Sequence, residues 1–284
     1  MALRDVLVHL EETRGEPARL ALAVELARRS EGHLIGLFAV EPISFSALAA
    51  PGGPDFAAAE AFQEIQEQHR QARLKVGERL GARFKDAAFR AGVASSEWRV
   101  VEDDAASAVM LHARYADLAV IGQSDPDNPE LGAGVAQSVL LGSGRPMLAV
   151  PFIGAEAIGK RVLVAWNASR EAARAVNDAL PLIQAAERVT VLSINPAGGI
   201  AGEGDVPAAD IALHLARHGV KAEAAYTQAA DISVGEVILS RAADLGADLI
   251  VMGGYGHSRL REFVLGGVTR GILRSMTAPT LMSH

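Results

Sequence analysis

The sequence predicts an α/β protein made of two tandem, doubly wound domains, and three observations support this fold class. Short apolar runs alternate with longer amphipathic segments, which is the pattern of strand–helix–strand units and a parallel sheet. Half of the 284 residues are hydrophobic but only 5% are aromatic, so aliphatic side chains and alanine must fill the interior, as in buried parallel sheets. The chain also repeats itself, because residues 116–122 (ADLAVIG) return as residues 247–253 (ADLIVMG).

The order of elements is clearest in the second half. Apolar runs predict strands near residues 161–166, 188–194, 221–227, 248–253 and 280–283. Amphipathic segments predict helices near residues 169–186, 206–219, 231–246 and 265–276. Parallel strands need crossover helices, and right-handed crossovers on both faces give a doubly wound sheet.

The first half follows the same order but carries extra residues, most of them between positions 44 and 91. They begin with Pro-Gly-Gly-Pro at residues 51–54 and continue as a predicted long helix. Its apolar residues recur at helical spacing and are expected to serve packing rather than to line a ligand site: Phe62, Ile65, Val76, Leu80 and Phe84. We expect one domain at residues 1–150, a linker at 151–160 and a second domain at 161–284.

Each half ends in a short predicted strand, at residues 147–150 and 280–283. Unpaired edge strands invite pairing, so we expect these two to pair antiparallel and to join the halves as an internal pseudo-dimer around a pseudo-twofold axis. Association of whole chains into a homodimer is a further expectation.

Composition excludes several function classes. Lys and Arg number 27 against 34 Asp and Glu, and the net charge of −7 repels a nucleic-acid backbone. The absence of cysteine excludes disulfides, thiolate metal sites and cysteine nucleophiles. No apolar run is long enough to span a membrane, and the first residues have the pattern of a strand rather than a signal peptide, so a cytoplasmic location is expected.

A glycine-rich stretch at residues 252–269 predicts a phosphate site. Gly253 and Gly256 stand at the carboxyl end of a buried strand, and Gly266 and Gly267 open the last helix. Glycines let backbone N–H groups approach an anion, and a helix N-terminus offers unpaired donors. Thr269 adds a hydroxyl group. Between Gly253 and the C-terminus the sequence has four arginines and one glutamate, so the local charge is positive.

The corresponding first-half loop, residues 122–134, has lost this character. It contains Asp125, Asp127 and Glu130 and no cation, so it should repel phosphate. Its acidic residues match no calcium loop. His214 and His218 lie four apart on a predicted helix, but no third metal ligand is evident, and His218 is better explained as a cation near a helix C-terminus.

The pattern Gly253-x2-Gly256-x9-Gly266, placed between a strand and the last helix, resembles the nucleotide-binding signature of the universal stress proteins. The opening of the second half at residues 162–170 also resembles that family's first strand and turn. The resemblance covers the chain as two tandem copies of the family's domain. Residues 161–284 are close to the family's sequence pattern, and residues 1–150 are a degenerate copy of it. It implies five-stranded parallel sheets in the order 3-2-1-4-5, binding of ATP or AMP, and a role in stress response.

The same resemblance implies positions for the nucleotide. It places the base near Ala165 and Ile194, and the ribose near Asn167 and Gly253, with Met252 as a further cofactor-binding residue. It places the phosphates, with any nucleotide-bound Mg²⁺, on Gly256, Gly266, Gly267, Val268 and Thr269. Nucleotide binders of the family usually have Asp where this chain has Asn167, and Ser or Thr where it has Gly267.

The expected function is therefore that of a non-catalytic stress-response protein that binds an adenine nucleotide in its second domain. One alternative is a slow ATP hydrolase or adenylyl-transfer enzyme, for which Glu262 is the only acidic residue after Gly253. Another is a ligand-free interaction protein that uses the long first-half helix as its partner surface.

Overall fold

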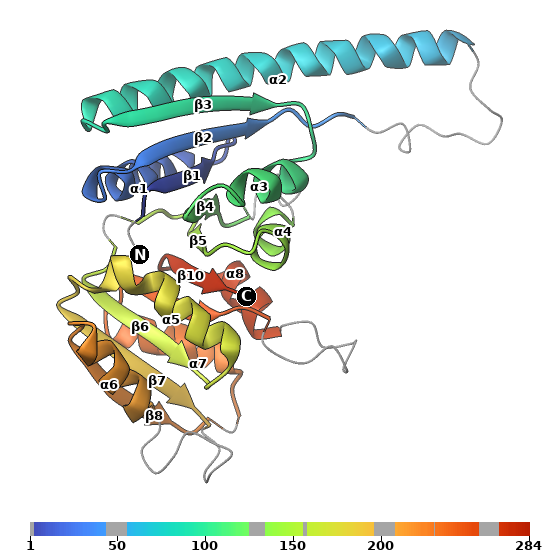
Figure 1. Cartoon of the computed structure of the whole chain (residues 1–284). Coiled ribbons are helices and arrows are strands. Elements are labelled where there is room, and N and C mark those ends of the chain that lie inside the picture. The colour runs from blue at the N-terminus through green and yellow to red at the C-terminus, as the bar shows by residue number, and fades with distance from the viewer. Residues whose placement is uncertain are drawn as a thin grey trace.

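The computed structural model describes residues 3–43, 56–124, 134–155, 158–195, 208–229, 231–255 and 267–284, with the side chains of 56–59 excepted (Figure 1). The first half consists of β1 (Asp5–His9), α1 (Glu16–Arg29), β2 (His33–Ala39), α2 (Phe56–Arg90), β3 (Ser95–Val101), α3 (Ala105–Ala113), β4 (Leu118–Gly122), α4 (Val135–Gly142) and β5 (Met147–Val150). The second half consists of β6 (Arg161–Trp166), α5 (Arg170–Ile183), β7 (Arg188–Ile194), α6 (Ala209–Arg217), β8 (Ala222–Thr227), α7 (Val234–Asp244), β9 (Leu249–Gly253), α8 (Gly267–Ser275) and β10 (Thr280–Ser283).

The described strands form one sheet in the order β3-β2-β1-β4-β5-β10-β9-β6-β7-β8. Within each half all neighbouring strands are parallel, and the order corresponds to 3-2-1-4-5. The predicted α/β class and strand order are therefore confirmed.

Helices cover both faces of the sheet because its strands are apolar on both sides. Alternate residues of β1 show this: Val6 and Val8 pack with α1 and α2 on one face, whereas Leu7 packs with α3 and α4 on the other. In the second half α5 and α6 cover the first face and α7 and α8 the second.

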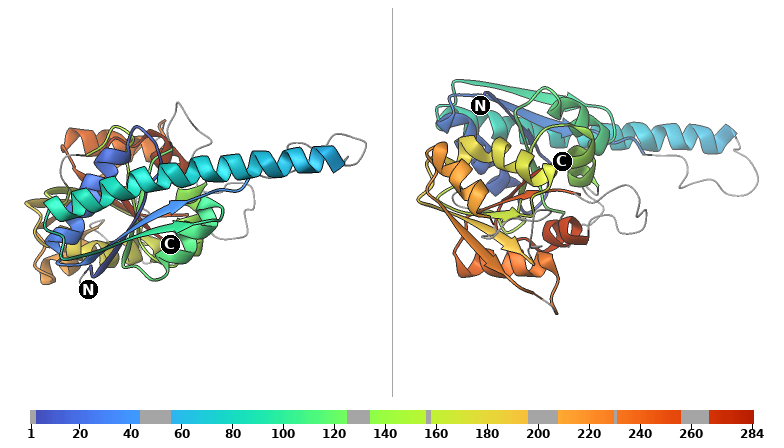
Figure 2. Two further views of the ribbon diagram at one scale, coloured as in Figure 1. Left: turned by 90° about the horizontal axis from the view of Figure 1, so that it is seen from above. Right: turned by 60° about the horizontal axis from the view of Figure 1, so that its bottom comes forward.

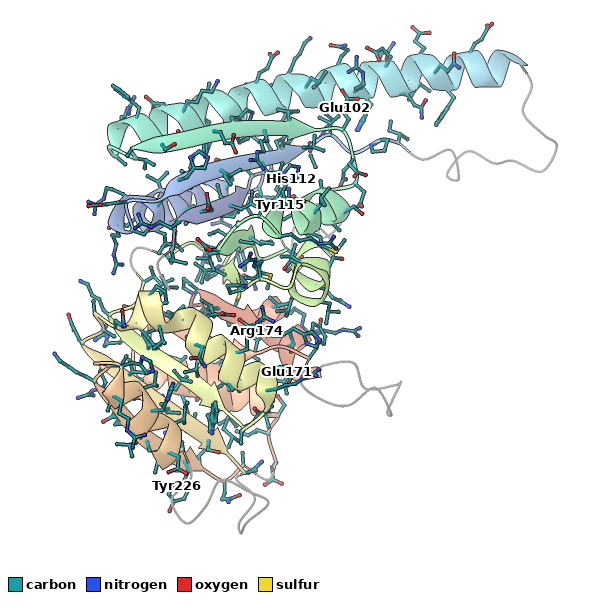
Figure 3. All side chains as sticks on the ribbon, in the orientation of Figure 1. Glu102, His112, Tyr115, Glu171, Arg174 and Tyr226 are labelled. Carbon is teal, nitrogen blue, oxygen red and sulfur yellow. The ribbon has the colours of Figure 1, made fainter. Side chains whose placement is uncertain are left out.

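The two halves meet where β5 pairs with β10, and this pairing is antiparallel as predicted. Leu148 lies opposite Leu281 and Met147 opposite Met282, all of them fully buried. Arg174 on α5 adds a polar contact, because its guanidinium donates to the carbonyl oxygen of Gly144 in the first half (Figure 3). The seam thus joins the halves through an apolar strand pair with polar contacts beside it.

The 35-residue helix α2 extends far beyond the sheet, as Figures 1 and 2 show. Its C-terminal part packs on β2 and β3 through Val76, Leu80 and Phe84, whose ring lies 5.5 Å from that of Trp98. Phe62 is buried as well, but Ile65 is 47% exposed, so the prediction that Ile65 is a packing residue was wrong. The next residue, Gln66, donates to the carbonyl oxygen of Ile43, which follows the end of β2 at Ala39, so Ile65 lies in the part of α2 that continues past this strand. No described helix is long and apolar enough to cross a membrane.

Candidate functional site

Each half has one place where the strand order reverses, between β1 and β4 in the first and between β6 and β9 in the second. In open α/β sheets, ligands bind at the carboxyl ends of the strands beside such a switch point. Both switch points of this chain are therefore candidate sites.

The second-half switch point brings several predicted residues together. Ala165 on β6 lies opposite Met252 on β9, and Gly253 is the next residue of β9. Ile194 ends β7, the other neighbour of β6. Asn167 follows β6 directly. The residues expected around the base and ribose thus share one edge of the sheet.

Asn167 shapes the turn between β6 and α5. Its Oδ1 atom accepts hydrogen bonds from the backbone N–H of Ser169 at 3.2 Å and from the Ser169 hydroxyl at 2.7 Å. Ser169 in turn caps α5, since its Oγ atom accepts from the N–H of Ala172. Asn167 itself is exposed and thus accessible to a ligand at this edge.

Gly253 allows the first turn of α5 to approach the end of β9. A Cβ atom at this position would lie 2.6 Å from the backbone nitrogen of Ala172, so any larger residue would push the helix away. The close approach gives Gly253 a packing role in addition to the ligand contact that the resemblance implies.

The first turn of α8 combines an open position with a buried one. Gly267 is exposed, and no described atom lies within 4 Å of a Cβ built on it. The Thr269 side chain is buried, and its Oγ1 atom accepts from the N–H of Tyr255 at 3.2 Å. This bond holds the start of the glycine-rich stretch against the helix, and Val268 beside Thr269 is half-buried.

Some predicted residues lie outside the described part of the chain. They are Gly256, His257, Arg259, Arg261, Glu262 and Gly266 in the second half, and Asp125, Asp127 and Glu130 in the first. The Pro-Gly-Gly-Pro segment at residues 51–54 is outside it as well.

At the first-half switch point a buried arginine occupies the corresponding place. Gly122 ends β4 as Gly253 ends β9, and a Cβ atom on Gly122 would lie only 1.6 Å from Nη1 of Arg19. Arg19 is 1% exposed. Its guanidinium lies 3.8 Å from a carboxylate oxygen of Glu11 and donates to the Thr13 hydroxyl at 3.4 Å. The chain's own ion pair therefore fills the space over Gly122.

These buried charges shift the pKa values of their neighbours. Burial raises the pKa of the Glu11 carboxyl, while Arg19 acts in the opposite direction. Burial, together with the cations of Arg19 and Arg73, lowers the pKa of His9 to about 3, so this imidazole is neutral throughout the physiological range.

A cavity of about 190 Å³ opens beside this ion pair, at the carboxyl ends of β1 and β2. Apart from two alanines, its lining consists of His9, Glu11, Phe38, Glu41, His69 and Arg73. This cavity was not predicted from the sequence. One signal was available: Arg19 stands among apolar residues on the buried face of a predicted helix, where an unpaired charge is costly.

The described residues contain no group of three or more His, Asp or Glu side chains that could hold a metal ion. His214 and His218 lie close, with ring centroids 4.7 Å apart, and His218 is the C-cap of α6. This is the helix-terminal position that the sequence analysis assigned to His218.

Comparisons with known proteins place the second half in a family. Residues 159–284 match the sequence pattern of the Universal stress protein family. A search of curated protein sequences returned no match.

Among solved structures, a universal stress protein from Archaeoglobus fulgidus DSM 4304 is similar over 98% of this chain and 95% of its own, with 14% identity and a TM-score of 0.67. A functionally unknown protein from Pseudomonas aeruginosa PAO1 is similar over 99% and 92%, with 16% identity and a TM-score of 0.54. A putative universal stress protein from Pseudomonas aeruginosa UCBPP-PA14 is similar over 99% and 93%, with 17% identity and a TM-score of 0.52. At these identities the likeness shows a shared fold.

Both halves therefore have the strand order of one fold, and the second also carries the family's sequence pattern. Residues 159–284 of this chain thus match the Universal stress protein family, and both halves share the fold of the similar solved structures.

Proposed function

We propose that the second half binds an adenine nucleotide, ATP or AMP, and that the protein acts in stress response as a non-catalytic nucleotide-binding protein. The observation that carries the proposal is the second-half switch point, where Asn167, Gly253 and the start of α8 lie at the carboxyl ends of β6 and β9. The expected cytoplasmic location and the homodimer of whole chains remain predictions.

The start of α8 suits the phosphates. Gly267 leaves the first turn of the helix open, and a helix N-terminus carries partial positive charge with N–H groups directed at an anion. Arg270, one turn further, is exposed and adds a cation to the same helix. A negatively charged nucleotide is therefore favoured here over a neutral ligand.

The first half should not take the same nucleotide, so we propose one site per chain. The Arg19 guanidinium lies against Gly122 and pairs with Glu11, whereas the equivalent Gly253 of the second half packs against the α5 backbone at Ala172. A ribose over Gly122 would have to displace a buried, paired cation, which costs several kcal/mol in comparable pairs.

The test is calorimetric titration of ATP and of AMP into the full chain and two glutamate variants of α8. Gly267→Glu adds a negative charge at the first turn of α8, and Gly271→Glu adds the same charge one turn later. At both positions no described atom lies within 4 Å of a built Cβ, so a side chain can start from either without a clash at Cβ. We expect about one site in wild type, at least tenfold weaker binding in Gly267→Glu, and affinity within about twofold of wild type in Gly271→Glu.

A glutamate in the first turn of a helix is stabilising, so unfolding would not explain a loss in Gly267→Glu. Equal affinity in all three proteins would show that nucleotide does not bind at α8. A stoichiometry of two per chain would contradict the assignment to the second half. Steady phosphate release from ATP by wild type would place the protein among the slow hydrolases instead.

A further inference from the structure

We propose that the first half positions the second-half switch point, so that the two halves act as one functional unit. Two first-half side chains are the positioning residues: Leu140 holds the backbone at Gly254, and Gln123 holds the far end of α8. The consequence for nucleotide affinity rests on the function proposed above, whereas the positioning itself can be measured without nucleotide.

The two halves exchange equivalent contacts across the seam. Gln123 directly follows β4, and Gly254 directly follows β9. Their backbone N–H groups make the same bond, that of Gln123 to the carbonyl oxygen of Val150 at 2.8 Å and that of Gly254 to the carbonyl oxygen of Ser283 at 2.9 Å. Val150 ends β5 and Ser283 ends β10, the two strands that pair across the seam. Each of these residues therefore stands beside the other half.

Gln123 reaches the second half with its long side chain, which is buried. Its Nε2 atom donates to the carbonyl oxygen of Arg274 at 2.9 Å, and its Oε1 atom accepts from the N–H of Phe152 at 3.0 Å. Arg274 lies in the last turn of α8, where the carbonyl groups of a helix have no partner within the helix. Gln123 therefore caps the C-terminal end of α8 from the other half.

At the equivalent place in the second half, the contact runs in the opposite direction. Gly254 has no side chain, and a Cβ atom built on it would lie 2.5 Å from Cδ2 of Leu140 on α4. Leu140 is 1% exposed and belongs to the same apolar cluster as Ile272 and Met276 of α8 and its C-terminal end. A first-half helix thus packs directly on the second-half backbone, one residue after Gly253.

The contact continues to the first turn of α8. Tyr255, the next residue, has a φ of 52°, in the left-handed region that bulky side chains rarely adopt. Its N–H donates to Oγ1 of Thr269 in the first turn of the helix. A strained residue keeps its conformation only where its surroundings hold it. Leu140 therefore supports the N-terminal end of α8 through Gly254 and Tyr255, while Gln123 holds the C-terminal end.

This arrangement gives the first half a role that needs no nucleotide of its own. Its switch point is filled by Arg19, yet α4 and the residue after β4 contact the second-half site. A site that is ordered before its ligand arrives loses less conformational freedom on binding. Loosening either contact should therefore weaken nucleotide binding without changing a residue that the nucleotide would touch.

The test compares matched leucine variants of the full chain by amide hydrogen exchange without nucleotide. Leu140→Ala removes the contact with Gly254, whereas Leu26→Ala empties an equally buried position of α1 on the opposite face of the sheet. Both leave a cavity in the first half, so a general loss of stability acts alike in both. We expect the Tyr255 amide to exchange at least about tenfold faster in Leu140→Ala and within about twofold of wild type in Leu26→Ala.

A compensating pair tests the contact itself. Gly254→Ala alone places a methyl group against Leu140 and should also speed exchange at Tyr255. In the Leu140→Ala background the same methyl group occupies part of the emptied space. The double variant should therefore exchange more slowly than Leu140→Ala alone, which is the opposite of an additive effect.

Gln123→Glu tests the second contact and provides a variant if Leu140→Ala does not fold. A carboxylate keeps the acceptor oxygen but cannot donate to the carbonyl group of Arg274, so the Met276 amide at the end of α8 should exchange about five- to tenfold faster. Gln184→Glu adds the same charge at the exposed C-cap of α5 and should change this exchange less than about twofold.

Equal exchange at Tyr255 in the two leucine variants, or at Met276 in the two glutamate variants, would overturn the proposal. Calorimetric titration of ATP then separates it from the proposed function. If wild type binds ATP, Leu140→Ala should bind at least about fivefold more weakly and Leu26→Ala within about twofold, and unchanged affinity in Leu140→Ala would overturn the coupling. If wild type does not bind ATP, the proposed function is wrong and the exchange rates alone decide whether the first half positions α8.

Discussion

Replacing Arg19 by Met should destabilise the protein by about 3 kcal/mol at pH 8, because it removes the counter-ion of two buried carboxylates. Glu11 lies 3.8 Å from the Arg19 guanidinium, and Glu16, which is 1% exposed, is close enough for its charge to act on Arg19. Breaking a buried ion pair by removing one partner typically costs 3–5 kcal/mol. The long separation in the Arg19–Glu11 pair, together with the second cation that Arg83 supplies to Glu16, places the expected loss at the lower end.

A surface pair of the same types provides the control. Arg79 contacts Glu12 at 2.7 Å, a shorter distance than in the buried pair, but the two side chains are 58% and 46% exposed. Exposed ion pairs contribute about 0–1 kcal/mol. We therefore expect Arg79→Met to cost less than about 1 kcal/mol, so that burial and not distance decides the effect.

The loss in Arg19→Met should grow with pH. Burial raises the pKa values of Glu11 and Glu16 above the ordinary value of 4.5, and Arg19 opposes the rise. Without Arg19 both folded-state pKa values rise further. A group with a raised folded pKa contributes stability below its unfolded pKa and loses that contribution as the pH passes its folded pKa. The free energy of unfolding of the variant should therefore fall more steeply than that of wild type above about pH 4.5.

Urea unfolding of wild type, Arg19→Met and Arg79→Met at pH 5 and pH 8 measures both effects. The double variant Arg19→Met/Glu11→Gln should recover about 1–2 kcal/mol of the loss at pH 8, because no unpaired carboxylate remains at position 11. The reasoning would be refuted if Arg19→Met and Arg79→Met lost the same stability, or if the loss in Arg19→Met did not depend on pH.

Three further predictions concern the nucleotide site, Gly122 and the cap of α7. The double variant Asn167→Asp/Gly267→Ser should bind ATP roughly 5- to 150-fold more tightly in calorimetric titration, since Gly267 has free space and an Asp keeps the acceptor oxygen of the turn; unchanged affinity would argue against the site. Gly122→Ala should lower the free energy of urea unfolding by about 1–3 kcal/mol by forcing Arg19 outward, whereas Gly271→Ala, in an open helical position, should raise it by up to about 1 kcal/mol. Ser233→Ala removes the capping box at the start of α7 and should cost about 1 kcal/mol; a loss below 0.3 kcal/mol would show that the cap is not needed.

The strands and helices of the second half could be predicted from the sequence to within a few residues. The strand near 188–194, for example, is observed as Arg188–Ile194, and the helix near 265–276 as Gly267–Ser275. Strands buried on both faces form uninterrupted apolar runs, which a single sequence displays directly. Helical periodicity gave a wrong prediction at Ile65, because the apolar spacing continues past the point where α2 leaves the sheet.

The first-half cavity could not be predicted in the same way. It combines His9 from β1 with Glu41 after β2 and Arg73 from α2, and no sequence pattern links residues so far apart in the chain. The position of Arg19 against Gly122 is equally a tertiary contact. The sequence shows only a glycine at position 122. It does not show that Arg19 packs against Gly122 whereas the α5 backbone packs against the equivalent Gly253.

The two switch points therefore differ in the group that packs against two equivalent glycines. Gly122 and Gly253 end equivalent strands, but an arginine side chain lies against the first glycine and a helix backbone against the second. A buried cation requires buried carboxylates, and these make the first switch point unsuitable for an anionic ligand. In the second, no described atom lies within 4 Å of a Cβ built on Gly267 at the start of α8, where we propose that the phosphates bind. A duplicated fold can thus place different chemical groups at equivalent strand ends of one continuous sheet.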